Sequence, residues 1–323
     1  MANLKEIKGI SIQAFSSDPA NPATGDMWYN STSCAFKCFG IPALAWTAGG
    51  ALGTARHSLA GAGTNTAALA FGGNIGGAAA CTESYNGTSW TAGGAMGTAR
   101  SCLAGAGTNT SALGFGGNGA DGLDDAVCTE SYNGTSWTAG GALATRRIKL
   151  AGAGASNTAA LAFGGSNMDG RQTSTESYNG TSWTAGGALS TARCSLAGAG
   201  TNTAALAFGG YGSAGYLTCT ESYNGSTWSA GGAMGTARYG LAGAGTNTAA
   251  LGFGGYNYPP GTLNCTESYN GTSWTAGGAL GTARYKLAGA GASNTAALAF
   301  GGRTTVSVAC TELYNMSSGV CQL

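Results

Sequence analysis

Residues 103–117 read LAGAGTNTSALGFGG and residues 128–139 read CTESYNGTSWTA, and these two stretches decide the fold. Each contains two short runs of strand-like composition separated by a turn signal, Thr-Asn-Thr in the first stretch and Asn-Gly in the second. Asn-Gly is a strong hairpin signal because both residues tolerate positive φ. The two stretches therefore predict four antiparallel strands, which we call a to d: 103–107, 112–117, 128–132 and one that begins at Trp137.

This four-stranded unit recurs along the chain. The Trp of strand d appears six times, at intervals of 44 to 47 residues, and Phe-Gly-Gly ends strand b six times. The tryptophans are Trp46, Trp90, Trp137, Trp183, Trp228 and Trp274, and the phenylalanines are Phe71, Phe115, Phe163, Phe208, Phe253 and Phe300. A period of about 40 to 50 residues with one Trp and one Gly pair is typical of β-propeller blades.

The first and last copies of the repeat are incomplete in complementary ways. The strand d at Trp46 has no strands a to c before it, and the last strands a to c, within residues 287–315, have no strand d after them. The N-terminal strand should therefore complete the last blade and leave no open sheet edge. We predict an all-β, six-bladed propeller of four-stranded blades over residues 45–316, closed by this N-terminal outer strand, with a β-rich N-terminal attachment arm at 1–44 and a C-terminal tail at 317–323.

The composition is unusual for a folded domain, with 60 glycines and only 8% charged residues. Regularly spaced aromatic residues nevertheless indicate a packed structure. Strand a contains little besides Gly, Ala and one Leu, which suits a crowded position where six strands meet around an axis.

Charge and hydropathy exclude several classes of partner. A formal net charge of +1 gives no long-range field for nucleic acid. The start, MANLKEIKGI, lacks the apolar core of a secretory signal, and no run of 18 apolar residues is present, so we expect synthesis in a cytoplasm and no membrane insertion. We also expect no cofactor.

The cysteines do not suggest a disulfide framework. Five of the ten occupy one repeat position on separate blades, too far apart for mutual disulfides, and are expected to be small buried hydrophobes. They are Cys81, Cys128, Cys219, Cys265 and Cys310. The sequence leaves open whether Cys34 and Cys38 are bridged.

One Arg and one Glu recur in every blade. A ring of six arginines could bind an anion, but equal numbers of Arg and Glu favour repeated ion pairs or hydrogen bonds to neighbouring blades, which would make this a structural ring. Its members are Arg56, Arg100, Arg147, Arg193, Arg238, Arg284, Glu83, Glu130, Glu176, Glu221, Glu267 and Glu312.

The copies differ mainly in the b–c connections and in the two residues after each repeated Arg. In an up-and-down blade the b–c and d–a connections lie on one face, so the variation predicts a recognition surface on that face. The alternative is that these loops vary in sequence only because no function constrains them. We expect Tyr211, Tyr216, Tyr256 and Tyr258, in adjacent blades, to stack on sugar rings. Further candidate ligand-binding residues are His57, Lys149, Arg171, Tyr239, Tyr285, Lys286 and Arg303.

One b–c connection is acidic. Asp121, Asp124 and Asp125 could hold Ca²⁺ through carboxylate oxygens, although an acidic solvated loop explains them as well.

The Gly-Gly, Tyr, Trp and Arg pattern of residues 46–315 resembles the kelch repeat family, whose members have a Gly pair at the end of the second strand and a Tyr and a Trp flanking the outer hairpin. Gly116-Gly117, Tyr132 and Trp137 match these positions, with a shorter Tyr-to-Trp spacing. The resemblance implies the propeller fold but no function, because propellers carry many activities. A cellular kelch-type protein-interaction adaptor therefore remains one alternative.

The segment 84–90, SYNGTSW, is also similar to the Asp-box of sialidases, which are six-bladed propellers. It has Asn in place of Asp and is one residue shorter. A sialidase would need one asymmetric cluster of arginines, a Tyr and carboxylates, whereas these charges repeat in every blade. We therefore predict no enzyme activity and no catalytic residue, and keep a sialidase-like glycosidase as a disfavoured alternative.

The arm contains GDMWYNSTS at 25–33, followed by Phe36-Lys37, and resembles a short β motif near the N-termini of bacteriophage tail-fibre and appendage proteins. The Gly/Ala-rich repeats with LAFGG are also similar to proteins of aquatic phages. We predict a virion protein whose residues 1–44 bind other virion proteins and whose variable face binds a host-surface glycan or protein. A capsid or neck decoration protein without a ligand is the alternative, and the sequence leaves homo-oligomers open.

Overall fold

The computed structural model describes residues 13–20, 26–39, 44–119, 127–316 and 320–322. Within these ranges all regular secondary structure is β. The chain divides into two compact units, Trp46–Asn315 and a second one formed by Met1–Ala45 with Met316–Leu323.

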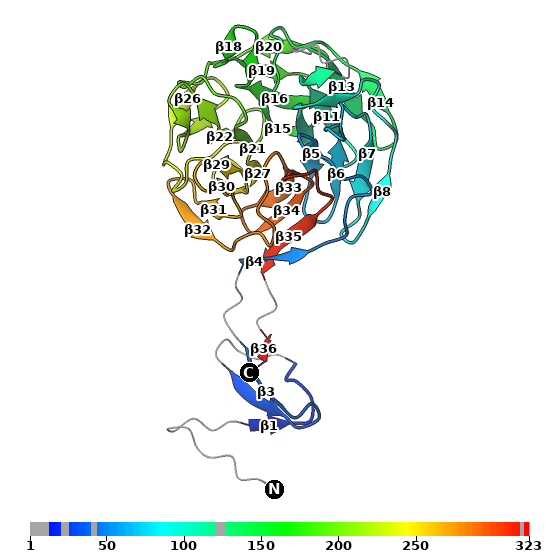
Figure 1. The fold of residues 1–323 in the computed structure, drawn as a ribbon, viewed down its shortest axis with the longest axis vertical. Coiled ribbons are helices and arrows are strands. Elements are labelled where there is room, and N and C mark those ends of the chain that lie inside the picture. The colour runs from blue at the N-terminus through cyan, green and yellow to red at the C-terminus, as the bar shows by residue number, and fades with distance from the viewer. Residues whose placement is uncertain (1–12, 21–25, 40–43, 120–126, 317–319, 323) are drawn as a thin grey trace. The chain divides into compact units, whose positions relative to one another are not determined.

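The larger unit is a six-bladed β-propeller, with six four-stranded antiparallel sheets arranged around an axis (Figure 1). Blade 1 comprises β5 (Ala60–Gly63), β6 (Ala68–Phe71), β7 (Thr82–Tyr85) and β8 (Trp90–Ala92). Blade 2 comprises β10 (Ala104–Gly107), β11 (Ala112–Phe115), β13 (Thr129–Tyr132) and β14 (Trp137–Ala139). Blade 3 comprises β15 (Ala151–Ser156), β16 (Ala159–Phe163), β19 (Thr175–Tyr178) and β20 (Trp183–Ala185).

The other three blades repeat this order. Blade 4 comprises β21 (Ala197–Gly200), β22 (Ala205–Phe208), β25 (Thr220–Tyr223) and β26 (Trp228–Ala230). Blade 5 comprises β27 (Ala242–Gly245), β28 (Ala250–Phe253), β31 (Thr266–Tyr269) and β32 (Trp274–Gly277). Blade 6 comprises β33 (Ala288–Ser293), β34 (Ala296–Phe300), β35 (Thr311–Met316) and β4 (Leu44–Ala48).

Blade 6 closes the ring. Its sheet order is β33-β34-β35-β4, so a strand from the start of the chain supplies the outer edge of the last blade. The predicted fold class and its closing N-terminal strand are confirmed. Strand a begins one residue later than predicted, at the Ala that follows the repeated Leu.

The inner strands require glycine because their backbones approach closely. A Cβ on Gly105 would lie 2.7 Å from the carbonyl oxygen of Gly61 in the neighbouring blade and 2.7 Å from Cζ of Phe71. The equivalent glycine meets a neighbouring carbonyl in every blade, at 2.5–2.7 Å. The glycine-rich strand a is therefore a consequence of six strands converging on one axis.

The outer strands hold each blade to the one before it. In blade 2, Nε1 of Trp137 donates a hydrogen bond to Oγ1 of Thr82 in blade 1 at 2.9 Å, and its ring packs on Phe71 at 4.9 Å between centroids. The other five tryptophans make the same bond at 2.9 Å, and Trp46 thereby connects β4 to blade 5. The repeated aromatic residues therefore form a continuous belt of contacts between blades.

The smaller unit contains a sheet of order β1-β2-β3-β36, formed by β1 (Gln13–Phe15), β2 (Met27–Asn30), β3 (Ala35–Phe39) and β36 (Val320–Gln322). Trp28 on β2 is buried and donates from Nε1 to Oδ1 of Asp18 at 3.0 Å, and Asn30 donates to the same oxygen at 2.7 Å. The predicted C-terminal tail is thus not a separate piece, because β36 pairs with β3 in this sheet.

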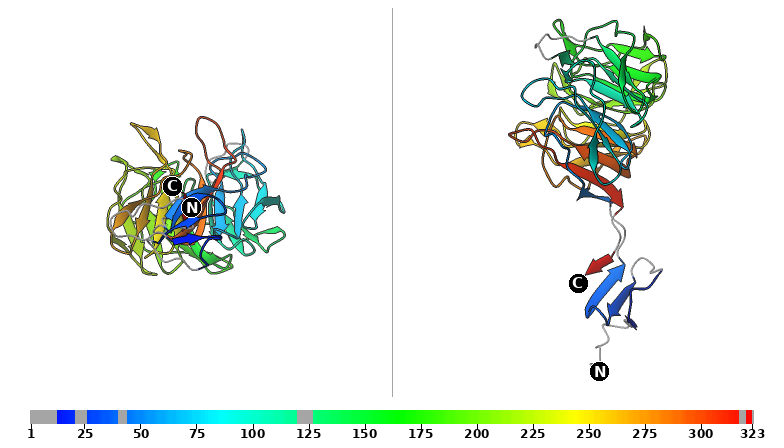
Figure 2. Two further views of the ribbon diagram at one scale, coloured as in Figure 1. Left: turned by 90° about the horizontal axis from the view of Figure 1, so that it is seen from below. Right: turned by 90° about the vertical axis from the view of Figure 1, so that its right-hand side faces the viewer.

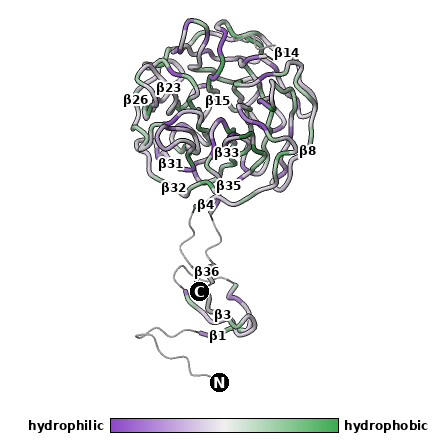
Figure 3. The backbone as a smooth tube through the Cα atoms, viewed as in Figure 1, coloured by the Kyte–Doolittle hydropathy of each residue, from purple (hydrophilic) through white to green (hydrophobic). Residues whose placement is uncertain are grey.

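Polar and apolar residues are interspersed along the strands (Figure 3). Over the described part of the chain, no helix has the length and apolar character to cross a membrane.

Candidate ligand-binding site

The repeated Arg fixes the d–a connection where it enters each blade. The side chain of Arg147 is fully buried, and its Nη2 lies 2.7 Å from Oε1 of Glu176. Nη1 donates to the carbonyl oxygens of Gly164 and Ser174, while Oε2 of Glu176 accepts from the backbone N–H of Ala144. Because these charges satisfy one another inside the blade, they are not available to a ligand.

The same pairing occurs in all six blades, with N–O distances of 2.7–3.2 Å and arginine side chains that have no exposed surface. Burial lowers the pKa of Arg100 and the paired Glu130 opposes this shift, and the guanidinium stays charged at neutral pH. The pairs connect each d–a connection to strand c of the blade that it enters, so they rigidify the base of the variable face.

The second residue after each Arg belongs to a closed hydrogen-bonded circle, which we call the axial ring. Its members are Ser58, Cys102, Lys149, Ser195, Gly240 and Lys286. The backbone N–H of each donates to the carbonyl of the member in the preceding blade at 2.6–2.9 Å, and Ser58 completes the circle by donating to Lys286. All six have a left-handed φ of 51–62°. Five non-glycine residues in this region indicate that the ring geometry overrides the backbone preference.

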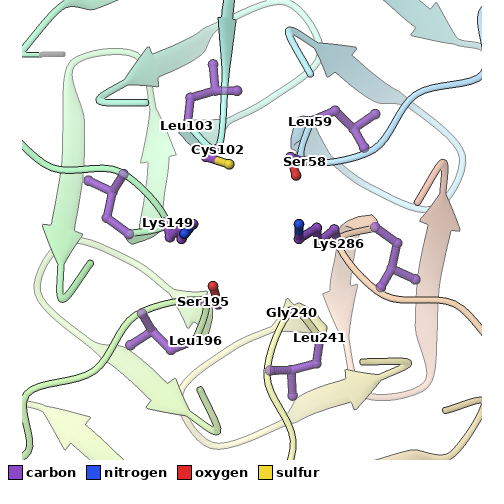
Figure 4. A pocket seen from close by; sticks show the side chains of 12 residues that line it. Ser58, Leu59, Cys102, Leu103, Lys149, Ser195, Leu196, Gly240, Leu241 and Lys286 are labelled. Atoms are coloured by element: carbon purple, nitrogen blue, oxygen red, sulfur yellow. The ribbon is translucent and has the colours of Figure 1, made fainter. Parts of the chain in front are cut away.

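The axial ring surrounds a mouth at one end of the propeller axis (Figure 4). Lys149 and Lys286 extend toward the axis from opposite sides of this mouth, whereas the other four members have short side chains or none. The ring thus presents two ammonium groups on an otherwise open rim.

The first residue after each Arg brings the b–c connection onto the same face. Tyr239 and Tyr256 exchange backbone hydrogen bonds at 3.1 and 2.9 Å, and Cys194 and Tyr211 do so at 3.1 and 2.8 Å. The b–c connections also form short hairpins: β17 (Ser166–Asn167) with β18 (Gly170–Arg171), β23 (Tyr211–Gly212) with β24 (Gly215–Tyr216), and β29 (Tyr256–Asn257) with β30 (Gly261–Thr262). In blade 2, β9 (Arg100–Ser101) pairs with β12 (Asn118–Gly119). Edge-on views of the ring show such hairpins extending beyond the blades (Figure 2).

Five half-buried tyrosines from three adjacent blades form a tyrosine patch: Tyr211, Tyr216, Tyr239, Tyr256 and Tyr285. The rings of Tyr216 and Tyr239 are nearly parallel, with an interplanar angle of 13° and centroids 5.6 Å apart. Tyr239 also contacts Tyr256 at 5.6 Å, and Tyr256 contacts Tyr285 at 5.4 Å. Burial, followed by the neighbouring tyrosines, raises the pKa of Tyr239, so this central hydroxyl stays neutral at physiological pH.

A cavity of about 340 Å³ lies where the patch meets the axial ring. Its lining includes Tyr211, Tyr216 and Tyr239 on one side and Lys149 and Lys286 on the other. This volume lies near the lower end of the range for small-molecule sites, which is roughly 300 to 1,000 Å³. Cys194 and Ser195 complete the lining, and sequence reasoning had not selected either of them.

Further cations surround the patch. The guanidinium carbon of Arg171 lies 4.6 Å from the ring centroid of Tyr211, and Nζ of Lys286 lies 5.5 Å from that of Tyr285. Burial lowers the pKa of Lys286, and the charges of Lys149 and Arg303 lower it further, against an opposing effect of Cys102. His57 is also affected: burial, then Lys286 and Arg303, lower its pKa to about 4.

The structure separates some candidates from this group. Tyr258 is 71% exposed at the tip of its connection and makes none of the ring contacts of the patch. The charge of Lys286 contributes to the lowered pKa of His57, but Nδ1 of His57 is hydrogen-bonded to Oγ of Ser307 at 2.9 Å. Asp121, Asp124 and Asp125 lie outside the described residues. Cys34 forms no disulfide. The expectation that the five repeat cysteines are buried was wrong: four of them are half-buried and Cys128 is exposed.

Comparison with known proteins adds no family to this description: no protein-family model matches the chain, and no curated protein matches it either.

Proposed function

We propose that the protein is a structural component of a phage virion, a tail fibre or appendage, that recognises a host-surface glycan or protein without catalysing a reaction. The observation that carries the proposal is the tyrosine patch beside the 340 Å³ cavity, on the face where the repeats differ. Tyrosines offer a large flat apolar surface with a polar edge, which suits the faces of sugar rings and the side chains of a protein partner.

The frame beneath the patch supports a binding role. The buried Arg–Glu pairs and the axial ring hold the variable connections without using any of the tyrosines. A ligand would therefore meet a site that is already formed, and little conformational entropy would be lost on binding.

The likeness of residues 25–37 to a phage appendage motif motivates the virion assignment, and the kelch-like character of the repeats is part of the same proposal. In this proposal residues 1–44 bind other virion proteins and the propeller is displayed outside the host after lysis. A decoration protein without a ligand and a cellular adaptor are the rivals that an experiment must separate.

Immunogold electron microscopy of particles from infected cells, with antibody against residues 46–323, tests the location. Label at fibre or tail tips supports the proposal. Label over the capsid favours a decoration protein, and particles without label would refute the virion assignment in favour of an adaptor.

Binding of the full-length protein to host cells tests the recognition site. Tyr216→Ala should reduce binding by about tenfold, since removing a central aromatic contact commonly costs more than about 1 kcal/mol. Tyr258→Ala is the matched control, because it removes an exposed tyrosine outside the patch. Equal binding by both variants and the wild type would rule out the patch as the recognition site.

A further inference from the structure

The axial mouth contains a pair of lysines whose charges no described carboxylate balances. Lys149 enters from blade 3 and Lys286 from blade 6, on opposite sides of the ring, and both side chains extend toward the axis (Figure 4). Both also line the cavity that borders the tyrosine patch. The two ammonium groups are therefore shared between the mouth and the cavity.

The acidic residues of the propeller are used elsewhere. In the part of the propeller that the structure describes, six glutamates are buried in Arg–Glu pairs. The other described acidic residue is Asp169, which is exposed at the tip of a b–c connection and is not among the residues that line the cavity. Arg171 and Arg303 add positive charge on the same face. The cavity thus combines two lysines that no described carboxylate pairs with and a wall of tyrosine rings.

The charges around Lys286 favour the binding of an anion beside it. Its pKa is lowered by burial and by two further cations, Lys149 and Arg303, against an opposing effect of Cys102. An anion between the ammonium groups would relieve this repulsion, because an opposite charge favours the protonated form. The backbone N–H groups of the axial ring are already bonded to carbonyls, so the two ammonium groups are the charged donors that line the cavity.

We propose that this cavity binds an acidic sugar unit, with its carboxylate or sulfate between Lys149 and Lys286 and its ring against Tyr216 and Tyr239. This inference rests on the proposed recognition function and specifies the ligand class. The near-parallel tyrosines provide the apolar surface for a sugar face, and the lysines supply charge-assisted hydrogen bonds at the adjacent end of the cavity. Polyanions without a sugar ring would use only half of the site.

The test uses the full-length protein and a set of immobilised acidic polysaccharides. Each polysaccharide is presented in its native form and after chemical reduction of its carboxylates to alcohols or removal of its sulfates. We expect binding to at least one native acidic polysaccharide and at least a tenfold loss when its charged group is removed. The two treatments distinguish a carboxylate ligand from a sulfate ligand.

Lysine variants locate the site. Lys149→Met and Lys286→Met keep an unbranched side chain at the same backbone position and should each weaken binding by about tenfold, whereas Lys286→Arg should retain most of it. Arg146→Met is the matched control, since it removes an exposed cation that does not line the cavity. Binding should also weaken between about 0.05 and 0.5 M salt, because salt screens exposed charges.

The outcomes separate this inference from the proposed function. Equal binding to native and neutralised polysaccharides, or full binding by both lysine variants, overturns the acidic-sugar assignment but leaves carbohydrate recognition in place. Failure to bind any saccharide, with cell binding retained, also overturns it and points to a protein receptor. If the wild-type protein does not bind host cells, the proposed function itself is wrong, whatever the result with the polysaccharides.

Discussion

The two ends of the propeller axis are built from the same repeat but differ in sequence freedom. At the far end every blade contributes Gly-Ala-Gly, at 61–63, 105–107, 152–154, 198–200, 243–245 and 289–291. At the mouth the equivalent ring position holds Ser, Cys, Lys or Gly. The difference has a steric cause: side chains at the mouth extend into open space, whereas a Cβ on the first glycine of each Gly-Ala-Gly would meet a neighbouring backbone. Function can therefore diversify at one end without disturbing the ring.

The mouth end is supported by the buried Arg–Glu pairs, and breaking one should give the largest effect. Glu176→Gln leaves the charge of Arg147 buried without its counter-ion and should lower the free energy of unfolding by about 3 to 5 kcal/mol. Denaturant unfolding measures this loss. Asp169→Asn is the control, because it neutralises an exposed carboxylate and should change stability by less than about 0.5 kcal/mol. Equal stability of the two variants would contradict a structural role for the pair.

A methyl group at the crowded part of strand a should give the next largest effect. In Gly152→Ala the new Cβ would lie 2.7 Å from the carbonyl oxygen of Gly105 and 2.7 Å from Cζ of Phe115. Relief of this overlap must shift a blade, so we expect a loss of about 1 to 3 kcal/mol in thermal or denaturant unfolding. Gly77→Ala, whose Cβ meets no atom within 4 Å, is the control. If Gly152→Ala leaves the free energy of unfolding unchanged, the blades can move apart at no cost and the close packing of strand a is not required.

The same kind of change at the mouth should be tolerated, which is the sharpest test of the comparison. Gly240→Ser places a Ser in the axial ring at a φ of 62°, close to the values of 54° and 51° at Ser58 and Ser195. The nearest atom to its Cβ would be 3.4 Å away. We expect a loss of no more than about 1 kcal/mol, from the backbone preference alone. A loss as large as that of Gly152→Ala would show that both ends are equally constrained.

The last effect concerns the single histidine. Because burial and nearby cations lower the pKa of His57 to about 4, below its ordinary value of 6.5, the folded state favours the neutral imidazole. Its contribution to stability is therefore complete above about pH 6.5 and is lost as the pH falls toward 4. NMR titration of the ring protons should give a midpoint near 4, and Lys286→Met should raise it. An unchanged midpoint in that variant would show that the charge of Lys286 does not lower the pKa of His57.

Periodicity determined the fold. The repeated Trp, Phe-Gly-Gly and Thr-Glu-Ser-Tyr segments predict four strands per unit, and the unpaired strand at Trp46 predicts how the ring closes. These features are visible in one dimension because each blade uses local turns and the period of the chain equals the period of the structure. The position of the variable connections along the repeat also indicated which face would differ between blades.

Tertiary structure alone decided which of the variable residues meet. Tyr216 and Tyr239 are separated by 23 positions and Lys149 and Lys286 by 137, yet each pair lines one cavity. Tyr258 lies only two residues from Tyr256 but is outside the patch. The physical reason is that circular closure and the left-handed backbone of the axial ring set the direction of these side chains, and neither is encoded by residue type at the ring positions. The sequence by itself determined the frame and its variable face, and the folded ring determined which side chains face one another across the mouth.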